Sequence, residues 1–81
     1  MQETEGRKAI VDETGIIDYA YFKQVSDGWL YLIDSDPDQL YIGPFDTFIE
    51  AYNDAAWLNG GLELDDLEPR WRKECLKQHK M

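Results

Sequence analysis

The chain has 81 residues, with 17 acidic and 8 basic side chains, a formal net charge of −9, 43% hydrophobic residues and 14% aromatic residues. This apolar and aromatic content excludes a disordered polypeptide, and the length allows one folded domain. Because so short a chain buries only about 60–65% of its unfolded surface, we expect no deep catalytic cleft and no enzyme.

Strand signals dominate the first half of the chain. Residues 1–14 are mostly polar, and we predict a flexible N-terminal segment there. The run Ile16–Val25 is rich in β-branched and aromatic residues and predicts a strand, which the hairpin signal Asp27-Gly28 ends. A second strand is expected over Trp29–Ile33 and, after the turn DSDPDQ, a third over Leu40–Gly43.

Two helices are expected after the strands. Thr47 and Glu50 form the pattern of a capping box, with Asp46 as an alternative N-cap, and the helix is expected to end at Asn59-Gly60-Gly61. A second helix is predicted from about Asp66–Pro69 towards His79. Residues 15–81 are therefore predicted to form a single small α+β domain. Its architecture is a three-stranded antiparallel meander followed by two helices packed on one face, in the order β-β-β-α-α.

The predicted sheet has two different faces. The side chains expected to form the core under the helices are Leu30, Leu32, Leu40 and Ile42. The side chains expected to point away from the helices are Trp29, Tyr31 and Tyr41. Tyr19 and Tyr21 join them if a three-residue loop connects the first two strands, whereas a two-residue loop turns both tyrosines to the core. Exposed Tyr and Trp clusters are typical of interface hot spots, although the N-terminal segment or a second protomer would cover them equally well.

The loop DSDPDQ places Asp34, Asp36 and Asp38 at alternate positions. They match the first three ligand positions of an EF-type calcium loop, but Gln39 stands where that loop needs glycine and Phe45 where it needs glutamate. The segment is instead typical of a turn, because Asp, Ser and Pro are turn-forming residues. We predict no metal site and no cofactor.

A second group of acids has helical spacing. Asp46, Glu50 and Asp54 recur every four residues, which places them along one helix edge about 6 Å apart. Together with the three aspartates of the loop, they either keep the protein soluble or present a phosphate-like array to a basic groove. In size and charge the chain resembles the small acidic DNA-mimic inhibitors that phages use against restriction and CRISPR systems. That resemblance implies a partner with a basic, nucleic-acid-binding surface.

The strand-to-helix junction YIGPFDTFIEA resembles that of SPOR domains and of several small bacterial proteins. The matching residues are Gly43, Pro44, Phe45, Asp46 or Thr47, Glu50 and Ala51. The resemblance implies that the Gly-Pro turn ends a strand, that the Phe packs beneath the helix and that the polar residue caps it. SPOR domains contain two β-α units, whereas this chain shows one meander and two successive helices, so peptidoglycan binding does not carry over.

Charge and composition also bear on partners and compartment. Residues 12–68 hold fourteen acids and one base, so this body repels nucleic-acid phosphates and anionic lipid, and we expect direct binding to neither nucleic acid nor membrane. The single cysteine, Cys75, fits a reducing compartment, and the start MQETEGRK lacks the apolar region of a signal peptide. We therefore expect a cytoplasmic protein.

The sequence thus favours a non-enzymatic acidic protein-binding module. Its most specific form is an inhibitor or regulator, bacterial or phage in type, that occupies a basic nucleic-acid-binding surface of a partner protein. The candidate partner-binding residues are Asp34, Asp36, Asp38, Asp46, Glu50 and Asp54, with Trp29, Tyr31 and Tyr41 as anchors. The alternative is a small bacterial adaptor or structural module that interacts, or forms a homodimer, through the aromatic sheet face.

Overall fold

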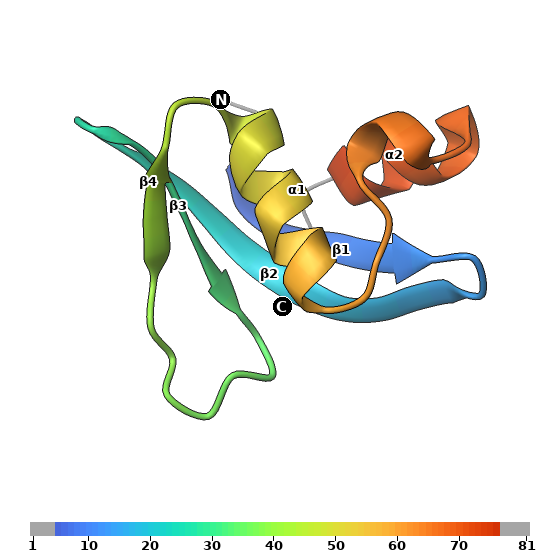
Figure 1. Cartoon of the computed structure of the whole chain (residues 1–81), viewed down its shortest axis with the longest axis horizontal. Helices are drawn as coiled ribbons and strands as arrows, with labels where there is room; N and C mark the ends of the chain where they lie inside the picture. Colours follow the sequence, from blue (N-terminus) through green and yellow to red (C-terminus); the bar gives the residue numbers. More distant parts are fainter. Residues whose placement is uncertain (1–4, 77–81) are drawn as a thin grey trace.

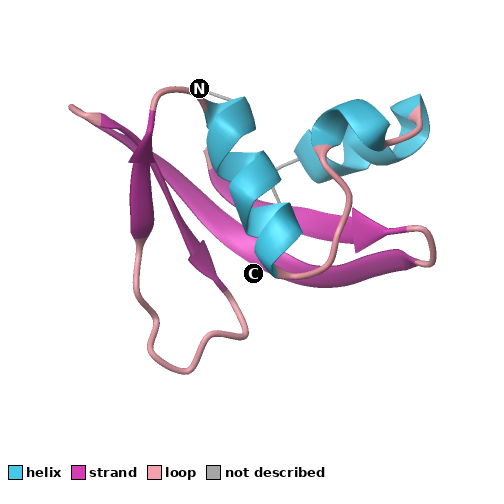
Figure 2. Cartoon of the chain, in the orientation of Figure 1, coloured by secondary structure: helices cyan, strands magenta, loops and turns pink. Residues whose placement is uncertain are grey.

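The computed structural model describes residues 5–76, which form one antiparallel sheet and two α-helices. The elements in chain order are β1 (Gly6–Asp12), β2 (Gly15–Val25), β3 (Gly28–Ile33), β4 (Ile42–Phe45), α1 (Phe48–Leu58), a short 3-10 helix η1 (Leu64–Asp66) and α2 (Pro69–Leu76). The strands lie in the order β1-β2-β3-β4. Both helices lie on the same side of the twisted sheet, with α1 in contact with all four strands and α2 against β1 (Figures 1 and 2).

The α+β class, the antiparallel sheet and the two helices are confirmed, but the prediction of three strands is wrong. The fourth strand is Gly6–Asp12, which lies inside the segment 1–14 that was expected to be flexible. Its apolar centre, Ala9 to Val11, is fully buried, and it pairs with β2 through a short hairpin. Residues 1–4 and 77–81, including the predicted end of the second helix near His79, lie outside the described residues.

The predicted assignment of the sheet faces is also wrong. The hairpin between β2 and β3 has a two-residue loop and pairs Val25 with Gly28, so Phe22 stands opposite Tyr31 on the face that α1 covers. Trp29 and Tyr31 therefore point towards the helices and are buried. Tyr21, paired with Leu32, faces the other way. Because β3 is apolar on both faces, its alternation alone did not determine which face α1 would cover.

Aromatic rings fill the space between α1 and the sheet. The ring of Phe48, at the start of α1, lies 5.0 Å from the ring centroid of Phe22 and 5.5 Å from that of Trp29, both in edge-on geometry. One turn later, Tyr52 stacks on Phe22 at 5.9 Å. Phe45, just before the helix, stacks on Tyr31 at 5.8 Å. Such offset and edge-on pairs are favourable beyond the area that they bury, so this cluster holds α1 on the sheet.

The predicted start and end of α1 are confirmed. Thr47 is the N-cap, and its hydroxyl oxygen accepts a hydrogen bond from the Glu50 amide at 3.1 Å. At the other end the Gly61 amide donates to the Ala56 carbonyl at 2.8 Å, and Gly60 adopts a φ of 75°. That left-handed conformation suits glycine and turns the chain back towards β1.

Two polar contacts fasten α2 and α1 to β1. Lys8 is fully buried, and its Nζ donates a hydrogen bond of 2.5 Å to the Leu76 carbonyl at the C-terminal end of α2. The Tyr52 hydroxyl donates to the Ala9 carbonyl at 2.8 Å. Burial, together with the adjoining Cys75 thiol, raises the pKa of Tyr52. β1 is therefore part of the core, although it is an edge strand of the sheet.

Candidate protein-binding surfaces

The three acids predicted along the helix differ in position and environment. Glu50 and Asp54 lie on α1, and Asp46 precedes its N-cap, Thr47. Asp46 and Glu50 are exposed, and no ion pair within residues 5–76 engages either carboxylate. Asp54 is half-buried, and its Oδ2 accepts a hydrogen bond of 2.6 Å from the hydroxyl of Tyr31. Burial and this carboxylate raise the pKa of Tyr31. Asp46 and Glu50 can therefore meet a partner, whereas Asp54 already has a structural role.

The aspartates of the loop between β3 and β4 mainly shape that loop. Asp34 forms an ion pair with Arg7 at 3.5 Å. The Asp36 carboxylate accepts the amide of Asp38 at 3.0 Å, the hydrogen bond of an Asx turn. Gln39 adopts a φ of 52°, and its side-chain amide donates to the Asp36 carbonyl at 2.7 Å. Asp38 is the member of the three with an exposed carboxylate and no ion pair in the described part of the chain.

The six candidate carboxylates do not form one cluster. The loop with Asp34, Asp36 and Asp38 precedes β4, and Asp46 follows it, so these groups lie at opposite ends of that strand. Helix α1 then runs back, and Figure 1 shows its C-terminal end and the loop at the same end of the molecule. The acids therefore do not share one surface, because Asp34 pairs with Arg7 of β1 whereas Asp54 bonds the Tyr31 hydroxyl on the face under α1.

The three predicted aromatic anchors are not together. Trp29 is 7% exposed and Tyr31 is fully buried, so neither can contact a partner in this fold. Tyr41 is 46% exposed, and the Lys23 ammonium lies 4.2 Å from the centre of its ring. A patch formed by all three residues, as the sequence suggested, therefore does not exist.

The sheet face that no helix covers carries Tyr41, as predicted, and also Tyr19 and Tyr21, which were expected there only with a three-residue loop. The Arg7 guanidinium stacks 3.8 Å from the ring centre of Tyr19 and lies 6.0 Å from that of Tyr21. Lys23 and Tyr41 form the second cation–aromatic pair on this face. The long side chains of Arg7 and Lys23 therefore lie against the aromatic rings of this face, although Tyr41 remains 46% exposed.

Sequence reasoning missed the most exposed aromatic residue, Trp57. Its side chain is 73% exposed near the end of α1, and Ile49 on the same helix is 52% exposed. Trp57 follows the buried Phe48 by nine residues, which at 3.6 residues per turn places it on the opposite side of the helix, in line with Glu50. A helical projection of this segment would have found it.

Comparison of the chain with protein-family models, curated proteins and solved structures finds no match. Within residues 5–76, no three or more His, Cys, Asp or Glu side chains lie together so that they could hold a metal ion. The same part of the chain has no helix with the length and apolar character needed to cross a membrane.

Proposed function

We propose that this protein is a non-enzymatic binding module whose acidic surface binds a basic surface of a protein partner. The observation that carries the proposal is the outward side of α1, where exposed Glu50 and the preceding Asp46 lack ion pairs within the described residues and Trp57 is 73% exposed. An exposed tryptophan on the same side of the helix as an unpaired acid, about two turns away, supplies both an apolar anchor and charge steering. In its specific form, the partner's basic surface is one that binds nucleic acid, and the carboxylates take the place of phosphates.

The test reverses charge at the proposed surface and, with the same total charge, elsewhere. The test variant is Asp46→Lys/Glu50→Lys, and the matched control is Glu63→Lys/Asp65→Lys, which alters two exposed acids, one at the N-cap of η1 and one within it. Asp54 is left unchanged because it holds the Tyr31 hydroxyl. Each immobilised protein captures partners from a bacterial lysate at low salt. A purified partner is then tested for release at high salt and for loss of bound labelled DNA when the protein is added.

We expect the partner to bind the wild type and the control, and to bind the test variant at least about tenfold more weakly. We also expect the wild type to displace DNA from the partner. Equal binding to both double variants would contradict the role of α1. Binding that leaves the DNA in place would contradict the DNA-mimic form while keeping the acidic binding module.

The alternative proposal is an adaptor or structural module that associates through the uncovered sheet face. It is favoured by the row of Tyr19, Tyr21 and Tyr41, which differs from the set predicted from sequence. Association through apolar and aromatic area persists at high salt, whereas association through exposed carboxylates weakens. Sedimentation of the purified protein at low and high salt therefore separates the two proposals, because only the sheet-face module gives a dimer that persists in both.

A further inference from the structure

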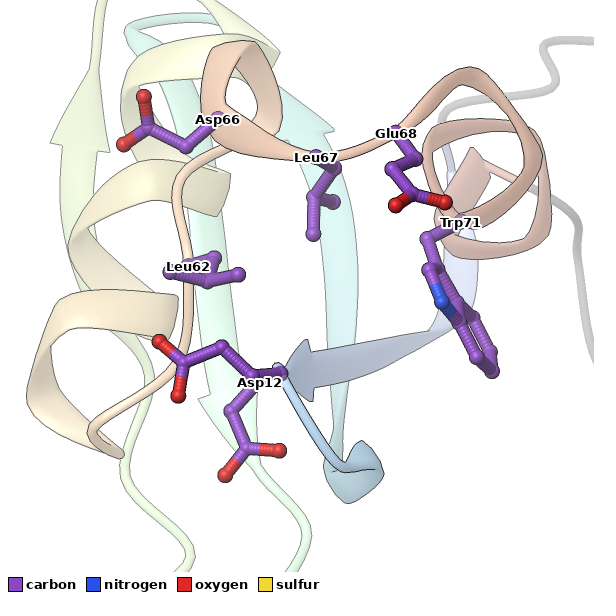
Figure 3. A pocket seen from close by; sticks show the side chains of 7 residues that line it. Asp12, Leu62, Asp66, Leu67, Glu68 and Trp71 are labelled. Carbon is purple, nitrogen blue, oxygen red and sulfur yellow. The ribbon is translucent and has the colours of Figure 1, made fainter.

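A hollow of about 230 Å³ lies between the hairpin that joins β1 to β2 and the segment that leads into α2. Its apolar walls are Leu62, Leu67 and the indole of Trp71, which Figure 3 shows around the same space. Leu67 is 4% exposed and Trp71 is half-buried, so these walls are parts of the folded core. The volume is below that of pockets for drug-sized ligands and suits a single side chain.

The rest of the lining is acidic. The other lining residues are Asp12, Glu13, Asp66 and Glu68, and no basic residue among those that the structure describes lines the hollow. Asp12 accepts hydrogen bonds from the Thr14 amide at 2.7 Å and the Thr14 hydroxyl at 2.6 Å, and these hold the pKa of its carboxyl below the ordinary value. No ion pair within residues 5–76 neutralises any of the four. The hollow therefore attracts cations.

Two of the basic residues near the hollow in sequence, Arg72 and Arg70, make contacts within the chain. The Arg72 guanidinium donates to the carbonyls of Leu64 and Leu67, both at 3.1 Å. The Arg70 guanidinium lies 5.0 Å from the ring centre of Trp71. The indole that borders the hollow therefore already contacts one guanidinium group of the same chain, that of Arg70.

We propose that this hollow binds the side chain of an arginine of a protein partner. A guanidinium is planar, stacks on an indole and pairs with carboxylates through several donors at once, while its alkyl stem fits between leucines. A lysine ammonium offers a point charge and a stronger hydration shell, so it gains less from the aromatic wall. The protein source of this arginine rests on the proposed function, but the chemistry of the site can be tested without the partner.

The test titrates the full chain with blocked tripeptides and follows the indole N–H signals of the three tryptophans by NMR at about 0.15 M salt, where distant charges are screened. The peptides are acetyl-Gly-Arg-Gly-amide, its lysine counterpart and its neutral citrulline counterpart, which keeps the shape of arginine without the charge. We expect a saturable shift of the Trp71 signal with arginine in the millimolar range, a weaker response with lysine and none with citrulline. Trp57, which is 73% exposed, is the internal control for unspecific stacking.

Glu68→Gln and Glu13→Gln test the acidic border at exposed positions, and Glu63→Gln is the matched control outside the lining. We expect each test variant to bind arginine about two- to fivefold more weakly, and the control to change affinity by less than about twofold. Well-dispersed amide spectra verify that each variant is folded. The proposal is overturned if Trp71 does not respond, if citrulline or lysine binds as well as arginine, or if Glu63→Gln weakens binding as much as Glu68→Gln. If one of these results is found while the protein still captures a partner through Asp46 and Glu50, the arginine site is refuted and the proposed acidic binding surface stands.

Discussion

The hydrogen bond between Tyr31 and Asp54 offers the sharpest test of how the acidic helix is joined to the sheet. Tyr31→Phe removes the hydroxyl that donates to the carboxylate at 2.6 Å and leaves the ring contacts with Phe22 and Phe45 in place. Hydrogen bonds to charged groups contribute about 1.5–3 kcal/mol, and Asp54 is half-buried. We expect the free energy of unfolding to fall by about 2 kcal/mol, which lowers the urea midpoint by about 1–2 M for a domain of this size.

The assay is urea denaturation followed by tryptophan fluorescence, and the control is Tyr41→Phe at a 46% exposed tyrosine, where we expect a change within about 0.5 kcal/mol. Asp54→Asn, alone and combined with Tyr31→Phe, completes a double-mutant cycle. A coupling energy of at least about 1 kcal/mol is expected for a direct contact. Two results would refute a structural role for Asp54. The first is that the changes in the free energy of unfolding add up in the double variant, and the second is that Tyr31→Phe lowers that free energy no more than Tyr41→Phe does.

Three further outcomes follow from the same structure. Burial raises the pKa of Tyr31 and Tyr52, so their contribution to stability is complete below the ordinary tyrosine pKa of about 10. Above that pH the free energy of unfolding should fall by up to about 1.4 kcal/mol per pH unit for each tyrosine. Urea midpoints from pH 8 to 11 measure this loss, and midpoints that do not change with pH would contradict it. Gly28→Ala should lower the free energy of unfolding by more than about 2 kcal/mol, because a Cβ there would overlap the backbone of β4. Gly60→Ala, where the space is open and φ is 75°, should lower it by about 1 kcal/mol. Equal thermal midpoints for the two variants would contradict this difference. Trp57→Ala should leave stability within about 0.5 kcal/mol of wild type but abolish capture of the α1 partner, and undiminished capture would remove Trp57 from the interface.

Local sequence signals predicted the parts of the fold that local interactions determine. The capping residue Thr47 and the glycines after Leu58 fix the ends of α1 through hydrogen bonds within a few residues, and both ends are where the sequence placed them. β1 was missed because its burial depends on α2, more than fifty residues later, which no local pattern of residues 6–12 contains. The polar residues around Ala9–Val11 hid a short apolar core segment.

The candidate surface was predicted only in part, for a similar reason. The four-residue spacing of Asp46, Glu50 and Asp54 predicted three acids along one helix edge, but Asp46 precedes the N-cap Thr47. The spacing also could not show that Tyr31 would reach Asp54. Trp29 and Tyr31 were assigned to the outer face because a strand with apolar residues on both sides has no preferred orientation without its helix. Tertiary packing therefore decides which aromatic residues are exposed. Trp29 and Tyr31 were expected to be exposed and are buried, whereas Trp57 is 73% exposed and was not predicted as a surface residue.

The contact between Lys8 and the Leu76 carbonyl joins residues 68 positions apart and has a consequence for the order of folding. During synthesis on a ribosome, β1 leaves the exit tunnel long before α2 does, so the Lys8 ammonium must remain in water until the last helix is available. The sheet from β2 to β4 and α1 can assemble earlier, because their contacts are closer in sequence. Deleting α2 would therefore leave β1 covered only in part, by α1, and the Lys8 ammonium without the Leu76 carbonyl. Such a state is prone to association with other chains.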